Sequence, residues 1–298
     1  MRLVTYTPPG ESTPRVGLVN AQQKVVDLSK VGGNPPFEPR DMLSLIAAGD
    51  AALSWLRSTA MKSAQPAQDL DQVRLHAPIP RPRKNVFCVG WNYLEHFAEG
   101  AKMRVAQVEL PTHPVFFTKA PTAVTGPYDT VPVGPTLTTM LDWEAEFGVI
   151  IGKTGINISE DNAMSHVFGY TVINDVSARD IQRHHGGQWF RGKSLDGTCP
   201  MGPWILTADE ADAGNLRIMC RVNEVVKQDS NTSFMYFKLP RIIAELSAGL
   251  TLEAGDVIST GTPSGVGAGR TPPEFLKPGD VVETEIVGIG KMRNVVGG

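Results

Sequence analysis

The chain has 298 residues, of which 28 are basic and 31 acidic, so its formal net charge at pH 7 is −3. This near balance gives no electrostatic footprint for nucleic acid or for an anionic membrane, and small molecules are the expected partners. No apolar stretch approaches the roughly 20 residues that a membrane-spanning helix needs, and the start MRLVTYTPPG lacks the apolar core of a signal peptide. We therefore expect a cytoplasmic protein.

Residues 1–75 are predicted to form a small N-terminal α/β module. Three short strand-like runs, RLVTY, RVGLV and KVVDL, precede RDMLSLIAAGDAALSWLRS, in which apolar residues recur at helical spacing. The next segment, HAPIPRPRKN at 76–85, holds three prolines and is typical of a crossing between modules. The accessory module offers no candidate site.

The remainder, residues 76–298, is predicted to be a catalytic domain that is mostly β, of the α+β class. Strand-like runs follow one another as NVFCVG, PVFFTKA, FGVIIGK, YTVIND, PWILTA, DVISTG and VVETEIVGIG, and Gly and Pro separate them. Only SEDNAMSHVFG and LPRIIAELSAG have clear helical patterns.

Glu144 and Glu146 stand two residues apart, directly before the apolar run 147–151. On a strand, residues i and i+2 face the same side, so the two carboxylates would project together. Taken alone, such a pair is typical of a solvated strand edge. The apolar run instead indicates a strand buried on both faces, with the pair at its entrance. Asp175 follows a second apolar strand, and three converging carboxylates would suit Mg²⁺ or Mn²⁺.

His96 and Glu99 have the i, i+3 spacing that places two side chains on one face of a short helix. A carboxylate beside an imidazole orients the ring and raises its basicity, as a general base requires. An ordinary exposed helix pair is the alternative. The turn VGWNY before the pair and the segment EGAKMR after it favour a mobile lid.

Lys119 and Lys193 are candidates for neutralising a substrate carboxylate. Lys119 ends an apolar strand, whereas Lys193 is expected in a Gly-rich loop. The segment STGTPSGVGAG, residues 259–269, lacks the GK[ST] ending of a phosphate loop. Its backbone N–H groups and the hydroxyls of Thr260 and Thr262 are instead candidates for binding a substrate carboxylate or enolate.

Taken together, the motifs from about residue 84 to the C-terminus resemble the fumarylacetoacetate hydrolase family. The resemblance is carried, in chain order, by VGWNYLEHFAE, PVFFTKAPTAVTGP, LDWEAEFGVIIGK, GYTVINDVSARDIQ, WFRGKSLDGTCPMGPW, GDVISTGTPSGVG and FLKPGDVVETEIVGIGKMRN. It implies a rolled, mixed β-sheet and a homodimer.

The resemblance also implies roles for individual residues. Glu144, Glu146 and Asp175 would bind Mg²⁺ or Mn²⁺, and His96 with Glu99 would form a dyad on a lid that activates water. The positions that line the pocket in the family correspond here to Lys119, Arg179, Gln182, Lys193 and Thr262.

The function favoured at this point is hydrolysis of a C–C bond in a 2,4-dioxo acid of the acylpyruvate or fumarylpyruvate type, in the catabolism of aromatic compounds or sugar acids. His96 would deprotonate a water that attacks the 4-carbonyl, and the metal with Lys119 would stabilise the departing pyruvate enolate. Oxaloacetate-type decarboxylation and 2-hydroxydienoate isomerisation or hydration in the same pocket stay open, as does a non-catalytic, metal-dependent dicarboxylate binder. A phosphoesterase is disfavoured because no phosphate-cradling motif is present. Specificity is expected to depend on the lid after Glu99 and on RHHGGQW, residues 183–189.

Overall fold

The computed structural model describes residues 1–63, 65–100, 109–132, 134 and 136–297. The strands are β1 (Arg2–Thr7), β2 (Arg15–Val19), β3 (Lys24–Asp27), β4 (Gln68–Asp69), β5 (Arg74–Leu75), β6 (Val86–Gly90), β7 (Val115–Lys119), β8 (Val124–Thr125), β9 (Leu141–Asp142), β10 (Ala145–Ile151), β11 (Val167–Asn174), β12 (Ser177–Ala178), β13 (Cys199–Thr207), β14 (Arg217–Val222), β15 (Val225–Asn231), β16 (Val257–Ser259), β17 (Val281–Ile286) and β18 (Gly290–Val295). The α-helices are α1 (Met42–Ala47), α2 (Gly49–Ser58), α3 (Leu94–Glu99), α4 (Glu160–Ala163), α5 (Arg179–His184), α6 (Phe190–Lys193) and α7 (Leu239–Ser247). In the described residues the strands hold more of the chain than the helices do, which confirms the predicted mostly β fold.

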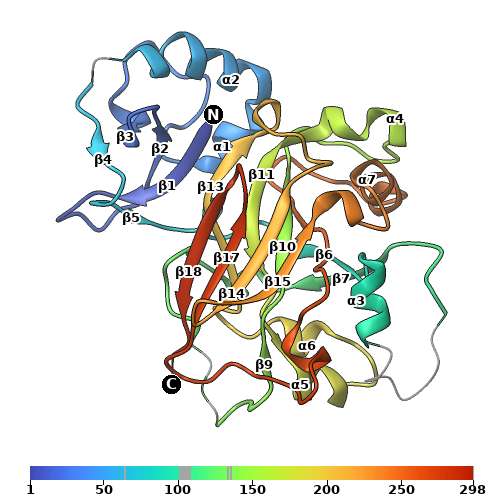
Figure 1. The fold of residues 1–298 in the computed structure, drawn as a ribbon. Helices are drawn as coiled ribbons and strands as arrows, with labels where there is room; N and C mark the ends of the chain where they lie inside the picture. The colour runs from blue at the N-terminus through green and yellow to red at the C-terminus, as the bar shows by residue number, and fades with distance from the viewer. Residues whose placement is uncertain (64, 101–108, 133, 135, 298) are drawn as a thin grey trace.

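A large mixed sheet forms the body of the molecule. Its 12 strands include the path β4-β3-β2-β1-β13-β11-β10-β16-β6-β7, with β5 beside β1 and β8 beside β13. Most neighbours are antiparallel, but β16 pairs with β6, and β13 with β8, in parallel. A second sheet of four strands, β15-β14-β17-β18, lies in front of β10 and β11 in Figure 1.

The N-terminal segment extends this same sheet. Its first strand, β1, pairs with β13 in the antiparallel register Arg2↔Leu206, and the three predicted strands are present as β1, β2 and β3. The predicted helical run is divided into α1 and α2 because the backbone of Gly49, the first residue of α2, has φ +51° and so interrupts the helical path. The division into a module of residues 1–75 and a catalytic domain of 76–298 stays a prediction.

Strand β10 is buried on both faces, as its continuous apolar run predicted. Its odd-numbered residues, including Phe147 and Val149, join a core with Ile218 of β14 and Ile286 of β17. Ile150 points the other way, into a core that includes side chains of α1 and α2. This alternation, which follows from the period of two in a strand, leaves Glu146 on the same side as Ile150.

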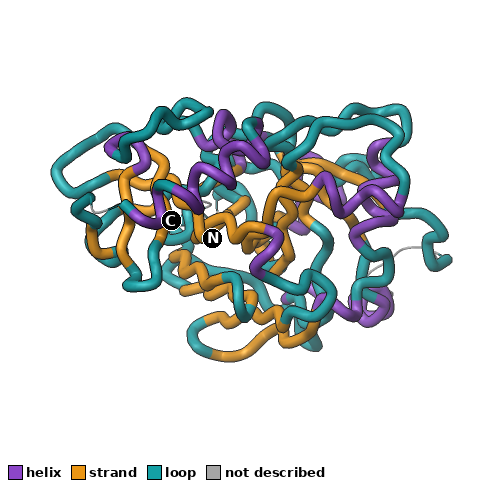
Figure 2. The backbone as a smooth tube through the Cα atoms, turned by 90° about the horizontal axis from the view of Figure 1, so that it is seen from above, coloured by secondary structure: helices purple, strands orange, loops and turns teal. Residues whose placement is uncertain are grey.

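Helices and loops lie around the central strands when the molecule is viewed from above (Figure 2). The longest α-helix in the described part of the chain, α2, has 10 residues, about half the length that a membrane span needs. None of the helices in those residues is long and apolar enough to cross a membrane.

Candidate active site

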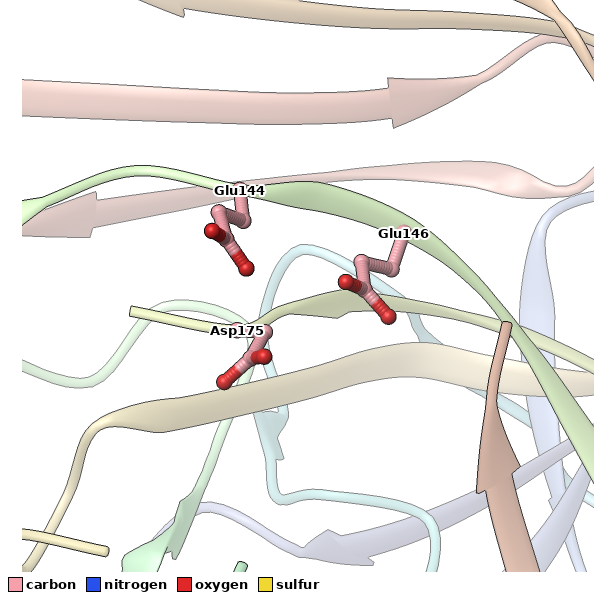
Figure 3. A group of neighbouring side chains, drawn as sticks. All are labelled: Glu144, Glu146 and Asp175. Atoms are coloured by element: carbon pink, nitrogen blue, oxygen red, sulfur yellow. The ribbon is translucent and has the colours of Figure 1, made fainter. Parts of the chain in front are cut away.

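Two neighbouring strands bring three carboxylates to one end of the large sheet. Strand β10 pairs with β11 in the register Ala145↔Asn174, so Glu144, just before β10, lies beside Asp175, just after β11. The Asp175 N–H donates to the Glu144 carbonyl oxygen at 2.9 Å. Glu146 is the second residue of β10, and one oxygen from each of the three carboxylates lies within 4.8 Å of the others (Figure 3). The structure thus brings together the three acids that the sequence singled out.

The three acids have different surroundings, and Glu146 is held by neutral donors. Its Oε2 accepts hydrogen bonds from Ser259 Oγ at 2.6 Å and from the Gly261 N–H at 2.9 Å. Burial, together with the negative charges of Asp175 and Glu144, raises the pKa of Glu146 well above its usual value. The charge of Lys193 offsets this only in part, so without a metal the Glu146 carboxyl group keeps its proton to a higher pH than an exposed glutamate does.

Glu144 and Asp175, in contrast, contact cationic side chains. Lys193 Nζ donates to Glu144 Oε2 at 2.6 Å and to Asp175 Oδ2 at 2.7 Å, and Lys119 Nζ donates to Asp175 Oδ1 at 2.7 Å. The expectation that Lys193 lies in a loop is wrong, because it is the last residue of α6. Burial alone would lower the pKa of Lys193, but the charges of Asp175 and Glu144 outweigh it and raise that pKa.

Arg179 provides the third buried cation. Its Nη2 donates to Glu144 Oε1 at 2.6 Å, and its Nη1 donates to Gln182 Oε1 at 3.3 Å. Burial opposes ionisation of Glu144, yet the positive charges of Lys193 and Arg179 overcome it and hold the pKa of Glu144 well below its usual value. Glu144 is therefore ionised at neutral pH. Its surroundings lower its pKa, whereas those of Glu146 raise the pKa of that group.

Asp142 is a buried acid whose role the sequence analysis missed. Its carboxylate accepts from Arg179 Nε at 2.9 Å and from the backbone N–H groups of Gly267 at 2.6 Å and Ala268 at 3.0 Å. Burial raises the pKa of Asp142 despite the charge of Arg179. The sequence held one signal for it, since Asp142 continues the two-residue alternation of Glu144 and Glu146 in LDWEAE.

The donor set of this cluster suits a divalent cation. With every group ionised, four buried carboxylates would meet three buried cations, an excess of one negative charge in the part of the chain that the structure describes; these groups are Asp142, Glu144, Glu146, Asp175, Lys119, Arg179 and Lys193. Carboxylate oxygens have two lone pairs each, so the contacts with the lysines leave capacity for a metal. Oxygen donors are the ligands that Mg²⁺ and Mn²⁺ prefer, and the residues present fit either ion.

A small cavity of about 50 Å³ opens beside the acids. Seven of the residues predicted for the site line it, namely His96, Glu144, Glu146, Arg179, Gln182, Lys193 and Thr262, together with Val89, Gly90, Trp91, Phe117 and Trp189. Lys119 does not line the cavity but contacts Asp175. A larger hollow of about 640 Å³, between residues 22–23, 69–75 and Tyr128, holds none of the predicted residues, so volume alone does not mark the site.

His96 and Glu99 lie together on α3, as their spacing predicted, with Nδ1 of the ring 3.3 Å from Glu99 Oε2. The Glu99 carboxylate also accepts from the Gly265 N–H at 3.0 Å. A Cβ on Gly269 would come within 2.3 Å of Glu99, so the glycines of this loop let α3 lie close to it. Only the start of the predicted lid can be followed, because residues 101–108 lie outside the described residues.

Thr262 is also placed at the cavity, through a hydrogen bond to the strand that carries Glu146. Its Oγ1 donates to the Ala145 carbonyl oxygen at 2.8 Å and accepts from Gln228 Nε2 at 2.8 Å. Because the hydroxyl proton is used in this bond, Thr262 would meet a ligand chiefly as an acceptor or through its backbone.

Comparison with known proteins agrees with this geometry. The model of the family "Fumarylacetoacetate (FAA) hydrolase C-terminal" matches residues 85–297. The chain belongs to the FAA hydrolase family. The resemblance inferred from the sequence motifs is thereby confirmed.

Relatives within the FAA hydrolase family are similar along nearly their whole length. Oxaloacetate tautomerase YisK of Bacillus subtilis is 43% identical over 294 residues, which cover 95% of this chain and 96% of the relative. The human mitochondrial oxaloacetate tautomerase FAHD2A is 43% identical over 299 residues, which cover 99% of this chain and 91% of the relative.

Solved structures of the family have the same fold. A fumarylacetoacetate hydrolase from the psychrophile Exiguobacterium antarcticum superposes with a TM-score of 0.81 at 39% identity, covering 100% of this chain and 99% of that one. A 2-hydroxyhepta-2,4-diene-1,7-dioate isomerase from Mycobacterium marinum superposes with a TM-score of 0.74 at 30% identity, covering 100% of this chain and 98% of that one. Members of the FAA hydrolase family are divalent-metal-dependent enzymes, and the buried triad of Glu144, Glu146 and Asp175 could hold such a metal.

Proposed function

We propose that this protein is a divalent-metal-dependent tautomerase that interconverts the keto and enol forms of oxaloacetate. The observation that carries the proposal is the cavity in which an acid–base candidate, His96, shares the lining with Glu144, Glu146 and Lys193. The proposal is supported by the 43% identity to two oxaloacetate tautomerases along nearly the whole chain.

Tautomerisation moves one proton to or from C3 and one to or from the oxygen on C2. Glu144, Glu146 and Asp175 would hold the divalent cation, which supplies Lewis-acid polarisation of the 2-oxo group. Lys193, whose buried ammonium lies between two of these acids, adds positive charge where the enolate oxygen develops. The residues of the cavity thereby stabilise the enolate, the charged intermediate through which the keto and enol forms interconvert.

His96 is the group that we assign to the proton on C3. Glu99 contacts Nδ1 of the ring, which leaves Nε2 for proton transfer. In the keto-to-enol direction Nε2 takes the C3 proton, which leaves an enolate and an imidazolium, and the imidazolium then gives a proton to the oxygen on C2, directly or through water. In the reverse direction the enol oxygen gives its proton back to His96 by the same route, and His96 returns it to C3. Glu99 would stabilise the imidazolium between these steps, and the Gly265 N–H would hold Glu99 in place.

C–C hydrolysis of a 2,4-dioxo acid, the activity favoured by the sequence, is kept as the second candidate. The specific observation for it is the same His96–Glu99 pair, which could activate a water as well as it could move a C3 proton. The similarity to a fumarylacetoacetate hydrolase also supports it. Oxaloacetate decarboxylation would use the same stabilisation of an enolate. A homodimer, a cytoplasmic location and a role in the catabolism of aromatic compounds also stay predictions.

The test uses oxaloacetate prepared as the enol in dry solvent and diluted into buffer. Loss of the enol absorbance is followed with Mg²⁺, with Mn²⁺ and with a chelator, and malate dehydrogenase in a parallel reaction reports the keto form. Tautomerisation predicts a metal-dependent acceleration above the uncatalysed rate, with no pyruvate formed. An enol decay that equals the buffer control at every metal concentration would refute the proposal.

Two further reactions separate the alternatives. Pyruvate formed from oxaloacetate, detected with lactate dehydrogenase, would indicate a decarboxylase. Pyruvate and equimolar acetate formed from acetylpyruvate would indicate the hydrolase. Binding of oxaloacetate without any of these products would indicate a binder that lacks turnover.

A further inference from the structure

Three aromatic side chains form a continuous wall of the candidate cavity, which we call the aromatic wall: Trp91, Trp189 and Phe117. The ring centroids of Trp91 and Trp189 are 5.0 Å apart at an interplanar angle of 74°, and those of Trp189 and Phe117 are 5.2 Å apart at 69°. These are edge-to-face contacts, which favour fixed ring positions. Trp189 is the central member, in contact with both of the others.

The position of Trp189 is determined from two sides. A Cβ added to Gly90 would lie 2.4 Å from Cζ3 of the indole, so Trp189 lies directly against the backbone of β6. Trp189 also caps α6, where its carbonyl oxygen accepts from the Lys193 N–H at 3.1 Å. Residues four apart on a helix share a face, so one helical turn presents both the indole and the ammonium of Lys193 to the cavity.

The aromatic wall and the acids leave little room for a ligand. The cavity measures about 50 Å³, whereas sites for drug-sized ligands are typically about 300–1,000 Å³. A 2-oxo acid must place its carboxylate and 2-oxo oxygens toward the acids and Lys193, so a bulky substituent on C3 would have to lie toward the aromatic wall. Because the indole already lies directly against the backbone of Gly90, it cannot move toward β6 to make room for such a group.

We infer that Trp189 is the residue that limits the substituent on C3 of the substrate, so that the site takes short-chain 2-oxo acids such as oxaloacetate and excludes those with a bulky C3 group. This inference rests on the proposed function for the binding mode of the substrate. It assigns to Trp189, at the end of RHHGGQW, the specificity that the sequence analysis expected of that segment without naming a residue.

The experiment compares two ligands that differ only at C3, pyruvate and phenylpyruvate. Their dissociation constants are measured by titration calorimetry against the Mn²⁺-loaded protein in the wild type, Trp189→Ala and Trp189→Phe. We expect the wild type to prefer pyruvate. Trp189→Ala should improve phenylpyruvate binding about 10-fold or more relative to pyruvate, since one methylene group in an apolar pocket changes the discrimination between two substrates about 10-fold to 200-fold. Trp189→Phe removes less volume and is the milder change for folding. Its ratio of the two dissociation constants should lie between those of the wild type and Trp189→Ala.

Phe190→Ala is the matched control. Phe190 is the next residue of the same helix, is 43% exposed and does not line the cavity, so its truncation should leave the ratio of the two dissociation constants unchanged. An unchanged ratio in both Trp189 variants would overturn the inference, as would equal affinity of the wild type for both ligands.

Oxaloacetate tautomerisation, measured on the same samples, separates this inference from the proposed function. A shifted binding ratio without tautomerisation in the wild type would refute the proposed function and retain the role of Trp189. Tautomerisation with an unshifted ratio would retain the function and refute that role. Failure of the Mn²⁺-loaded wild type to bind either 2-oxo acid, together with a lack of tautomerisation, would contradict both.

Discussion

Asp142 and Arg179 form a buried ion pair in which Arg179 Nε donates to Asp142 Oδ2 at 2.9 Å. Arg179 extends from there to Glu144 Oε1, at 2.6 Å, while Asp142 accepts from the backbone N–H groups of Gly267 and Ala268. The pair therefore joins the glycine-rich loop on which Glu99 rests to the first acid of the candidate metal site. Asp142 is in this sense a positioning residue for Glu144.

Asp142→Asn should weaken Mn²⁺ binding by about 10-fold, the lower end of the range for partners of metal ligands. The amide keeps the size of the side chain but removes the charge that orients Arg179, so Arg179 would hold Glu144 less firmly in place. Calorimetric titration with Mn²⁺ measures the change. Asp229→Asn is the matched control, since it removes an acid from the exposed Arg217–Asp229 pair; Mn²⁺ affinity that is equal in both variants and the wild type would contradict the role.

The three acids could be found from the sequence because their pattern is local. A continuous apolar run marks β10 as buried, and the period of two then fixes Glu144 and Glu146 on one side of it. Asp175 was found by the same argument on β11. The antiparallel pairing of these two strands, which places Asp175 beside Glu144, is the only non-local step that the prediction required.

The rest of the site depends on contacts that no local pattern encodes. Helices α5 and α6 have six and four residues, too few for a hydrophobic period to be visible. The sequence therefore predicts a loop at Lys193, and this prediction is wrong. Two of the partners of Asp142 are the backbone N–H groups of Gly267 and Ala268, which lie more than a hundred residues away in the sequence. Backbone donors carry no side-chain signature, so this contact could only be seen in the folded chain.

His96→Ala should reduce the metal-dependent tautomerisation rate by about 100-fold or more, the usual contribution of a positioned acid–base group. Mn²⁺ affinity should change little, because no carboxylate of the metal cluster depends on the ring for a hydrogen bond in the described structure. Rates measured by enol decay and Mn²⁺ binding measured by calorimetry give the two values. Glu99→Gln should give a smaller loss of rate than His96→Ala. If His96→Ala retained wild-type turnover, the proton acceptor would be a different group.

Lys193→Met should have opposite effects on metal binding and on catalysis. Removing the ammonium that bridges Glu144 and Asp175 adds to the excess of negative charge, so the variant should bind Mn²⁺ at least as tightly as the wild type. Its tautomerisation rate should fall, because a cation at the developing enolate is lost. If metal affinity and rate fell together, Lys193 would act mainly by organising the acids.

Addition of Mn²⁺ should stabilise the protein more strongly as the pH rises. Burial and the charges of Asp175 and Glu144 raise the pKa of Glu146 well above the usual 4.5. Between the unfolded and the folded pKa the native metal-free protein holds more protons than the unfolded chain, so its stability falls as the pH rises through that window. A bound cation removes this penalty, since it compensates the charge of Glu146 and takes the place of the proton.

The measurement is the gain in melting temperature on adding Mn²⁺, taken at intervals from about pH 5 to pH 8, which lies above the range in which an ordinary glutamate titrates. Glu146→Gln provides the comparison, because the amide is neutral at every pH and should abolish the pH dependence along with most of the Mn²⁺ effect. A gain that is independent of pH in the wild type would mean that Glu146 is already ionised in the metal-free protein, and would contradict this prediction.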